Sequence, residues 1–343
     1  MREPAFWHRP ASVRSLLLWP LGALYGAVTA IRMQRGGLDA GIPVFCVGNY
    51  HLGGAGKTPT VLALAGLLRE LDETPVVLSR GYGGRLHGPV MVDPARHRAA
   101  DVGDEPLMMA QHLAVAVARD RVDGVALAKS RRASVILMDD GFQNPRVAKD
   151  ASLIVIDSDR GIGNGFVFPA GPLRAPLSPQ LGRTDALVVI GKGHASDAVA
   201  AQIAGRGGPV FAARLAPQPA SVARLAGKRV LAFAGIGDPA RFFRTLRASG
   251  IEVVRERAFA DHHDFTPDEV AALLADAARE ALTPVTTEKD LVRLGTGTGL
   301  SALTQDIVAF AVTLEFEDTG GVRKFLSERL FRARGAKLAA RAN

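Results

Sequence analysis

The segment HLGGAGKT, residues 51–58, combines residue types that bind phosphate. A P-loop reads G-x-x-x-x-G-K-[ST]; Gly56, Lys57 and Thr58 fit its end, whereas His51 stands where the first glycine is expected. In such a loop, backbone N–H groups surround phosphate oxygens, the lysine neutralises the β- and γ-phosphates, and the threonine hydroxyl coordinates Mg²⁺. A glycine-rich turn with an unrelated lysine is the alternative. We predict a nucleotide-binding loop formed by His51, Leu52, Gly53, Gly54, Ala55, Gly56, Lys57 and Thr58.

Two adjacent carboxylates, Asp139 and Asp140, follow the apolar run at 134–138. Mg²⁺ prefers carboxylate ligands, and an acid that ends a buried strand beside a P-loop is the Walker B arrangement. Because successive side chains of a strand point to opposite faces, the two aspartates have different roles. Either can be the metal ligand. We assign Thr58 and Asp139 to the metal, and Asp140 with Lys57 to catalysis.

The composition predicts a folded protein with two domains. The chain has 343 residues, of which 48% are hydrophobic and 22% charged, and it exceeds one domain of about 100–200 residues. A single cysteine, Cys46, excludes an intramolecular disulfide and a zinc site built from several thiolates. The net charge of +8 favours an acidic partner such as a nucleotide, a phosphorylated substrate or an anionic lipid. Aromatic residues make up 6% and do not interleave with basic ones, so we expect no nucleic-acid partner, and no protein partner is evident.

Short apolar runs alternate with helical segments through the first two thirds of the chain. Apolar runs without polar alternation are typical of strands buried on both faces of a parallel sheet. The expected strands lie at 42–49, 74–82, 114–118, 134–140, 151–157 and 185–191, and helices are expected to begin near Lys57 and Asp104. We therefore predict an α/β, P-loop NTPase-like core domain over residues 36–225.

The pattern restarts near Ala226 and predicts a second, smaller α/β domain at 226–318. Within it, Thr266, Pro267 and Glu269 supply an N-cap, a first-turn proline and the acid of a capping box, so a helix is expected to follow. A last helix is expected at about 319–333, within a C-terminal region 319–343 that can return to the first domain.

No charged residue occurs from Ser15 to Ile31, and arginines flank this apolar segment on both sides. The segment can be a short membrane-spanning helix, a signal peptide, a membrane-dipping anchor or a buried helix of a soluble core. Pro20 and Gly22 are expected to interrupt the helix early, which favours dipping over spanning. We predict a membrane-associating segment over residues 1–35.

An ordered set of sequence blocks carries a family resemblance. The blocks are WPLGALYG, VGNYHLGGAGKTP (47–59), SRGYGG (79–84), VGDEP (102–106), ARDR (118–121), DDGFQ (139–143), FPAGPLR (168–174), ADHHDF (260–265) and TTEKD (286–290). The set resembles the tetraacyldisaccharide 4'-kinases, the lipid A 4'-kinases of Gram-negative bacteria, over nearly the whole chain. The resemblance implies an enzyme that uses Mg-ATP to phosphorylate the 4'-hydroxyl of a tetraacyl-disaccharide 1-phosphate at the cytoplasmic face of the inner membrane.

The resemblance also implies roles for single residues. Asp104 is the expected general base with His262 as its partner, since a sugar hydroxyl is a poor nucleophile. Glu105 is expected at the metal site. By their chemistry, and not by the resemblance, the expected substrate-binding residues are Arg80, Tyr82, Arg119, Arg121 and Gln143, since arginine holds phosphate bidentately and an amide bonds to a sugar hydroxyl or a metal-bound water.

Four further positions have no assigned role. Lys289 and Asp290 either contact nucleotide or pair with each other. Asn144 and Ala175 replace a histidine and an acid that are usual in the family, so neither receives a catalytic role.

Two other functions compete with the kinase. A membrane-associated regulatory P-loop GTPase or ATPase would share the loop, but a GTPase needs Asn/Thr-Lys-x-Asp, and in TTEKD the Lys and Asp are adjacent. A membrane-anchored basic scaffold would leave the loop and the acidic strand end unexplained. An assay of ATP consumption with and without the disaccharide lipid separates all three.

Overall fold

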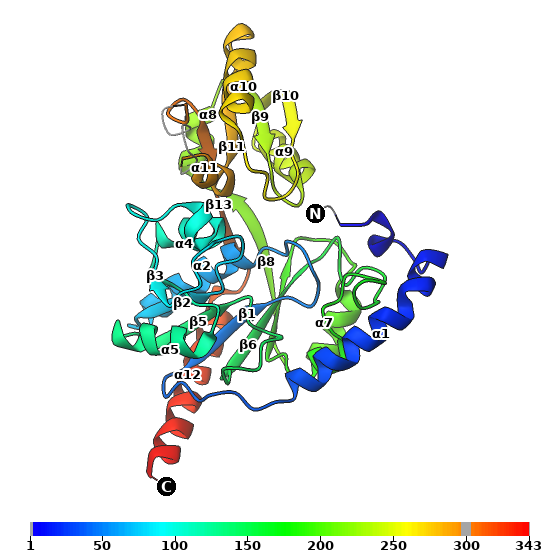
Figure 1. Cartoon of the computed structure of the whole chain (residues 1–343), viewed down its shortest axis with the longest axis vertical. Helices are drawn as coiled ribbons and strands as arrows, with labels where there is room; N and C mark the ends of the chain where they lie inside the picture. The colour runs from blue at the N-terminus through cyan, green and yellow to red at the C-terminus, as the bar shows by residue number, and fades with distance from the viewer. Residues whose placement is uncertain (1–2, 296–302, 343) are drawn as a thin grey trace.

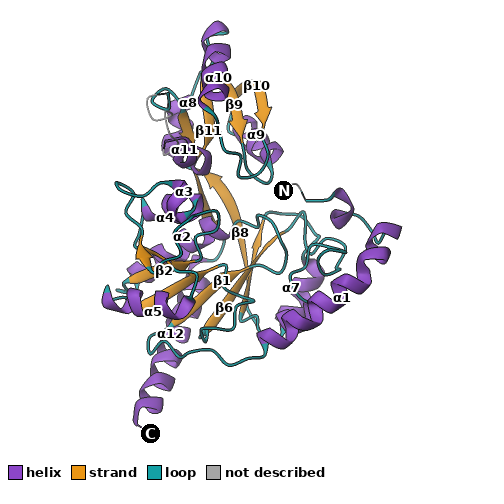
Figure 2. Cartoon of the chain, in the orientation of Figure 1, coloured by secondary structure: helices purple, strands orange, loops and turns teal. Residues whose placement is uncertain are grey.

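The computed structural model describes residues 3–295 and 303–342. In these residues the chain forms two β-sheets covered by helices (Figures 1 and 2). The larger sheet has nine strands in the order β13 (Val312–Phe316), β8 (Val210–Pro217), β7 (Ala186–Ile190), β6 (Ala151–Asp157), β1 (Val44–Gly48), β5 (Val135–Asp139), β2 (Pro75–Ser79), β4 (Val115–Val117) and β3 (Val90–Met91). All neighbours are parallel except the edge pairs β13–β8 and β3–β4, which are antiparallel.

The central strands are buried on both faces, as their apolar runs predict. On β1, Phe45 and Val47 pack in a core with α2 (Lys57–Glu70), α4 (Asp104–Ala110) and α12 (Thr319–Ala342). Val44 and Cys46 pack in a second core with α5 (Arg121–Ser130), α6 (Leu177–Leu181) and α7 (Asp197–Ala204) on the opposite face. This alternation follows from the two-residue period of a strand. The predicted strands β1, β2, β4, β5, β6 and β7 and the predicted helix start at Lys57 are confirmed.

The smaller sheet has four parallel strands in the order β10 (Glu252–Ala258), β9 (Arg229–Ala234), β11 (Thr283–Thr287) and β12 (Val308–Phe310). Its helices are α8 (Pro219–Leu225), α9 (Pro239–Ala248), α10 (Pro267–Arg279) and α11 (Glu288–Gly295). The capping box at the start of α10 forms as predicted: the side chain of Thr266 accepts from the Glu269 amide, and that of Glu269 accepts from the Thr266 amide.

Two strands join the sheets. β8 runs from the larger sheet toward the smaller one (Figure 1), and β13 returns beside it with Val312 paired to Pro217. β13 therefore pairs within the larger sheet, although the sequence analysis placed it in the 226–318 unit. Conversely, Leu225 of α8 packs in the core of the smaller sheet. We propose that the smaller unit spans residues 219–310.

Helix α12 is longer than the expected 319–333 and reaches Ala342. Phe325 and Leu326 pack in the core shared with α2. Near its end, Lys337 pairs with Asp39 at 2.8 Å and with Asp150 at 3.0 Å. These contacts hold α12 on the larger sheet.

Helix α1 (Val13–Met33) packs in an unusual sense for a helix of a soluble protein. Its buried residues are mostly small: Ser15, Gly22, Gly26 and Met33. Its large apolar residues face outward, with 44–74% of each exposed: Val13, Leu16, Leu17, Trp19, Leu21, Leu24, Tyr25, Val28 and Ile31. Among the described residues, α1 is the one helix long and apolar enough to cross a membrane. The alternative of a buried core helix is therefore wrong.

The expected interruption at Pro20 and Gly22 is also wrong, because α1 is continuous through both residues. Pro20 lies on the exposed side of the helix. Gly22 serves close packing, since a Cβ there would lie 2.7 Å from the carbonyl oxygen of Val167. Glycine thus lets α1 approach the loop before α6.

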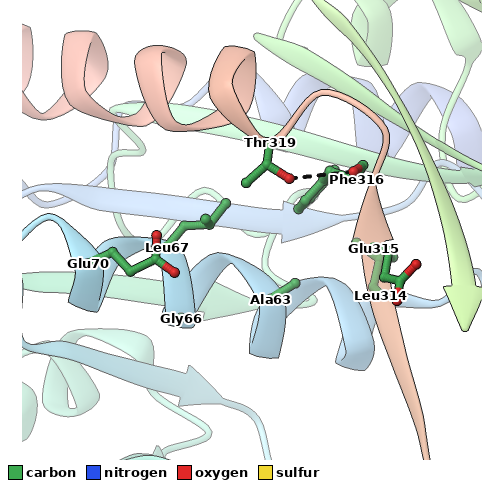
Figure 3. Close-up of a pocket in the computed structure, with 8 residues that line it drawn as sticks. All are labelled: Ala63, Gly66, Leu67, Glu70, Leu314, Glu315, Phe316 and Thr319. Atoms are coloured by element: carbon green, nitrogen blue, oxygen red, sulfur yellow. Dashed lines mark hydrogen bonds between the residues drawn. The ribbon is translucent and has the colours of Figure 1, made fainter. Parts of the chain in front are cut away.

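A cavity of about 420 Å³ lies between the second half of α2 and the β13–α12 connection (Figure 3). Its walls include Leu67, Glu70, Leu314 and Phe316. None of the predicted site residues lines this cavity, so the candidate site lies elsewhere.

Candidate functional site

The predicted nucleotide loop connects β1 to α2, at the carboxyl edge of the larger sheet. Gly53 and Gly56 adopt left-handed conformations, with φ of +96° and +86°. Within the described part of the chain, none of the backbone N–H groups of residues 53–57 donates a hydrogen bond. The N–H groups at the amino end of α2 are therefore available to an anion, as a phosphate loop requires.

Lys57 and Asp140 meet beside this loop. The Lys57 Nζ lies 3.6 Å from Asp140 Oδ1, and Arg174 Nη1 donates to the same oxygen at 2.8 Å. Arg174 also donates from Nε to the carbonyl of His51, at 3.1 Å. Burial alone raises the pKa of Asp140, but the charges of Lys57 and Arg174 outweigh it and hold that pKa well below its usual range.

Asp139 is the last residue of β5, and Asp140 follows it in a turn with φ of +50°, so the two carboxylates have different partners. Asp139 Oδ2 accepts from the Ser79 hydroxyl at 3.3 Å, and Arg121 donates to the backbone carbonyl of Asp139 at 3.3 Å. Burial and the nearby charges of Glu105 and Asp140 raise the pKa of Asp139 to about 7. A buried carboxylate surrounded by other carboxylates favours a cation as its partner.

Unsatisfied polar atoms gather around the loop. Five buried side-chain atoms in the described residues have no hydrogen-bond partner, and four of these belong to Asn49, His51, Arg121 and Asp139. Buried polar groups are normally paired, so such a concentration indicates a place where a ligand completes the hydrogen bonding. Asp139 Oδ1 in particular is a free carboxylate oxygen close to the loop, which fits Mg²⁺.

Asp104 begins α4 and faces the smaller unit across a seam, defined here as Asp104 and Glu105 facing His262, Lys289 and Arg293. Asp104 Oδ2 accepts from Arg293 Nη2 at 2.7 Å, and His262 Nδ1 lies 3.0 Å away. Burial alone raises the pKa of Asp104, but the hydrogen bond from His262 and the charge of Lys289 hold that pKa far below its usual range. The carboxylate is ionised at neutral pH.

Lys289 connects the remaining members of the seam. Its Nζ lies 3.0 Å from Glu105 Oε1 and 3.4 Å from His262 Nε2. Tyr82 adds an aromatic contact, with its ring centroid 5.8 Å from that of His262. Lys289 therefore pairs with Glu105 and not with Asp290, and contact of either residue with nucleotide stays a prediction. Asp290 pairs with Arg293 at 2.9 Å.

The five predicted substrate-binding residues occupy different environments. Arg80, Tyr82 and Arg119 are exposed, and 75% of Tyr82 is accessible. Arg121 is only 2% exposed and donates to the carbonyls of Ala118 and Asp139, so it does not reach the surface. Gln143 donates to the Asn49 carbonyl at 2.9 Å and to the Gln180 side chain at 2.9 Å.

Asn144 and Ala175, which depart from the family pattern, each make local hydrogen bonds. The Asn144 side chain accepts from the Arg146 amide at 2.9 Å, which forms a local turn. Ala175 is fully buried, and its carbonyl accepts from Gln180 at 2.8 Å.

Sequence reasoning missed Arg174, Arg293 and Ser79 as site residues. Arg174 ends the FPAGPLR block and Ser79 begins SRGYGG, so the blocks themselves were a usable signal for both. Arg293 lies three residues beyond Asp290 on α11, outside any block, and sequence offers only that helical spacing as a hint. Glu3 lies against the loop, since a Cβ on Gly53 would lie 1.8 Å from its Oε1.

The chain is similar to known proteins over nearly its whole length. A sequence profile of the family described as LpxK, tetraacyldisaccharide-1-P 4'-kinase, matches residues 14–331. A tetraacyldisaccharide 4'-kinase of Bradyrhizobium diazoefficiens is 71% identical over 334 residues, which cover 97% of this chain and 98% of that relative. Another, from Rhodopseudomonas palustris, is 66% identical over 339 residues, with 99% of this chain and 100% of the relative covered.

A crystal structure of LpxK from Aquifex aeolicus in complex with ATP is similar to this fold, with a TM-score of 0.70 and 28% identity. The similarity covers 93% of this chain and 100% of the other. Because the profile matches residues 14–331, which is nearly the whole chain, the chain belongs to the tetraacyldisaccharide-1-P 4'-kinase family.

Proposed function

We propose that this protein is an ATP-dependent kinase that phosphorylates the 4'-hydroxyl of a tetraacyl-disaccharide 1-phosphate, a lipid A precursor. The observation that supports it most directly is the convergence of Lys57, Asp139 and Asp140 beside a loop with unpaired backbone N–H groups. Family membership supplies the acceptor. The alternative of a regulatory GTPase or ATPase is not favoured, since the matched relatives are named as kinases.

In this proposal the loop at 51–58 binds the phosphates of ATP. Lys57 neutralises the transferring phosphate. Asp140 positions the lysine side chain, and Arg174 positions the loop through the carbonyl of His51. Thr58 and Asp139, with Glu105 nearby, are the residues that would hold Mg²⁺, which when bound neutralises charge on the phosphate oxygens. No three His, Cys, Asp or Glu side chains in the described residues form a complete metal cage. Mg²⁺ in kinases needs only one or two carboxylates, because phosphates and waters supply the rest.

In this proposal the seam residues act on the acceptor hydroxyl of the lipid. Asp104 is ionised, as a general base must be, although its depressed pKa lowers its affinity for the proton of a hydroxyl. His262 orients it through Nδ1, and the exposed Arg80, Tyr82 and Arg119 are placed to hold the sugar and its 1-phosphate. Arg121 and Gln143 contribute as positioning residues, because their polar groups hold the chain around Asp139 and Asn49.

The outward apolar face of α1 supports attachment to a membrane surface, and the lipid acceptor supports the cytoplasmic face of the inner membrane as the location. The fixed contacts of Ser15, Gly22 and Gly26 with the body of the protein favour a helix that lies in the interface over one that leaves it.

The deciding experiment is ATP consumption by the purified full chain with and without the disaccharide lipid. Acceptor-dependent ADP release, with phosphate found at the 4' position by mass spectrometry, supports the proposal. ATP hydrolysis that ignores the acceptor would instead indicate a regulatory ATPase.

A further inference from the structure

A second cavity, of about 380 Å³, lies where α1 ends. One wall is the chain from Met33 to Gly37, and the facing wall is formed by the loop that follows Asp140, including Asn144 and Ala148. The two walls are joined by hydrogen bonds, since Leu38 N donates to Arg146 O and Ala148 N donates to Leu38 O, each at 2.9 Å. The cavity is therefore a fixed feature of the fold and not a gap beside a loose end.

Three cations line this cavity: Arg35, Lys149 and Arg183. Within the described residues, none of them pairs with a carboxylate. Asp185 also lines the cavity, but its carboxylate already has partners. It pairs with Arg329 at 2.9 Å and accepts from the Ser152 amide at 2.8 Å.

Lys149 is partly buried in this cavity and shares it with Arg183. Burial and the charge of Arg183 lower the pKa of Lys149. Its side chain donates a hydrogen bond to the neutral carbonyl of Asn144. Three cations and one acid leave this concave site with a net positive charge, which attracts an anion.

We propose that this cavity binds the phosphate of an anionic membrane phospholipid. Arginine holds phosphate bidentately, and a volume of this size accommodates a small polar group. The position suits a lipid: Arg35 lies two residues beyond the end of α1 and four residues after the exposed Ile31, so the cations begin where the outward apolar face of α1 stops. Basic pockets beside membrane helices bind lipid head groups in this way.

The inference rests on the membrane attachment proposed for α1 but not on kinase activity. Its test is flotation of the full chain with vesicles of neutral phosphatidylcholine, and with vesicles that also contain phosphatidylglycerol. Binding to neutral vesicles reports α1, and the gain on anionic vesicles reports the cavity. The kinase assignment can fail without affecting either measurement.

Two kinds of variant isolate the cavity. Arg35→Gln with Arg183→Gln removes two of its cations, and the matched control, Arg224→Gln with Arg244→Gln, removes the same charge from exposed positions of the smaller unit. Ala148→Leu fills the cavity and leaves every charge in place. We expect wild type and the control pair to gain tenfold or more on anionic vesicles, and both cavity variants to lose most of that gain.

The proposal would be overturned if the control pair lost as much binding to anionic vesicles as the cavity pair, or if Ala148→Leu kept the full gain. Either result would mean that the positive charge of the whole protein attracts the vesicle, and not the cavity. If Ala148→Leu does not fold, the two charge pairs still decide between these outcomes. Soluble glycerol phosphate gives the last arm: if it raises the wild-type melting temperature through Arg183 without lipid, the cavity takes a free phosphate and the lipid assignment is wrong.

Discussion

Arg293 donates a hydrogen bond to Asp104 across 189 positions of sequence, at 2.7 Å, and both side chains are buried. The contact joins α11 of the smaller unit to α4 of the larger one. The same arginine pairs with Asp290, so it holds one carboxylate from each side of the seam.

Arg293→Met should lower the free energy of unfolding by about 3 kcal/mol, since breaking a buried pair leaves charge without compensation. Urea denaturation measures this loss. Arg293→Lys should recover part of the stability. A cost below 0.5 kcal/mol for the methionine variant would show that Lys289 and His262 suffice to neutralise Asp104.

Lys57→Ala should remove most of the turnover, on the order of 10²-fold or more, while the melting temperature stays close to that of wild type. Lys57 lies at the loop and compensates charge that is present only with nucleotide. The measurement is steady-state ADP release, with circular dichroism as the folding control. Turnover within threefold of wild type would remove the phosphate-loop assignment.

Asp104→Ala should reduce turnover by about 10²–10⁴-fold, the range for a positioned general base. His262→Ala should also cost a large factor, and the double variant should be little worse than Asp104→Ala, because residues that act as a unit are not additive. ATP affinity should hardly change, since neither side chain contacts the loop. Costs that multiply would separate the two roles, and loss of ATP binding in Asp104→Ala would make Asp104 a metal ligand.

Leu24→Glu should weaken binding to neutral vesicles at least tenfold, because it places a charge on the apolar face of α1. Leu24 is 67% exposed, so the variant should fold normally. Val254→Glu, at an exposed apolar position of the smaller unit, is the control and should bind like wild type. Unchanged flotation of Leu24→Glu would mean that another surface meets the membrane.

His51 should make stability depend on pH. Burial lowers the pKa of His51 from 6.5 to about 4. Between these values the unfolded chain binds a proton that the folded chain refuses, so this group destabilises the fold as pH falls from 6.5 to 4. The full effect is about 3 kcal/mol. Unfolding of wild type and His51→Gln at pH 7.5 and 4.5 measures it, and equal pH dependence in the two proteins would contradict it.

Those parts of the candidate site that are formed by consecutive residues could be predicted from the sequence. The loop at 51–58 and the pair Asp139–Asp140 follow apolar strands directly, and parallel strands bring their carboxyl ends to one edge. The Arg174–Asp140 and Arg293–Asp104 contacts could not be predicted, because no periodicity reports a pairing between residues 34 or 189 positions apart.

The errors in the fold have physical causes as well. β3 is only two residues long and too short for any period to show, and β8 mixes buried and exposed positions as an edge-proximal strand does. In α1, Gly22 suggested a break because sequence does not reveal that Val167 comes within 2.7 Å of its missing side chain.

The paired strands β8 and β13 make the smaller unit an insertion with adjacent ends. Gln218 N donates to Ala311 O at 3.0 Å, so the chain enters and leaves this unit through neighbouring residues. A short turn in place of 219–310 would convert the two strands into a plain hairpin and leave the nine-stranded sheet intact. Such a truncated protein would keep Lys57, Asp139 and Asp140 but lose His262, Lys289 and Arg293. Asp104, the proposed base, would also remain, so the smaller unit supplies the side chains that pair with this carboxylate and not the carboxylate itself.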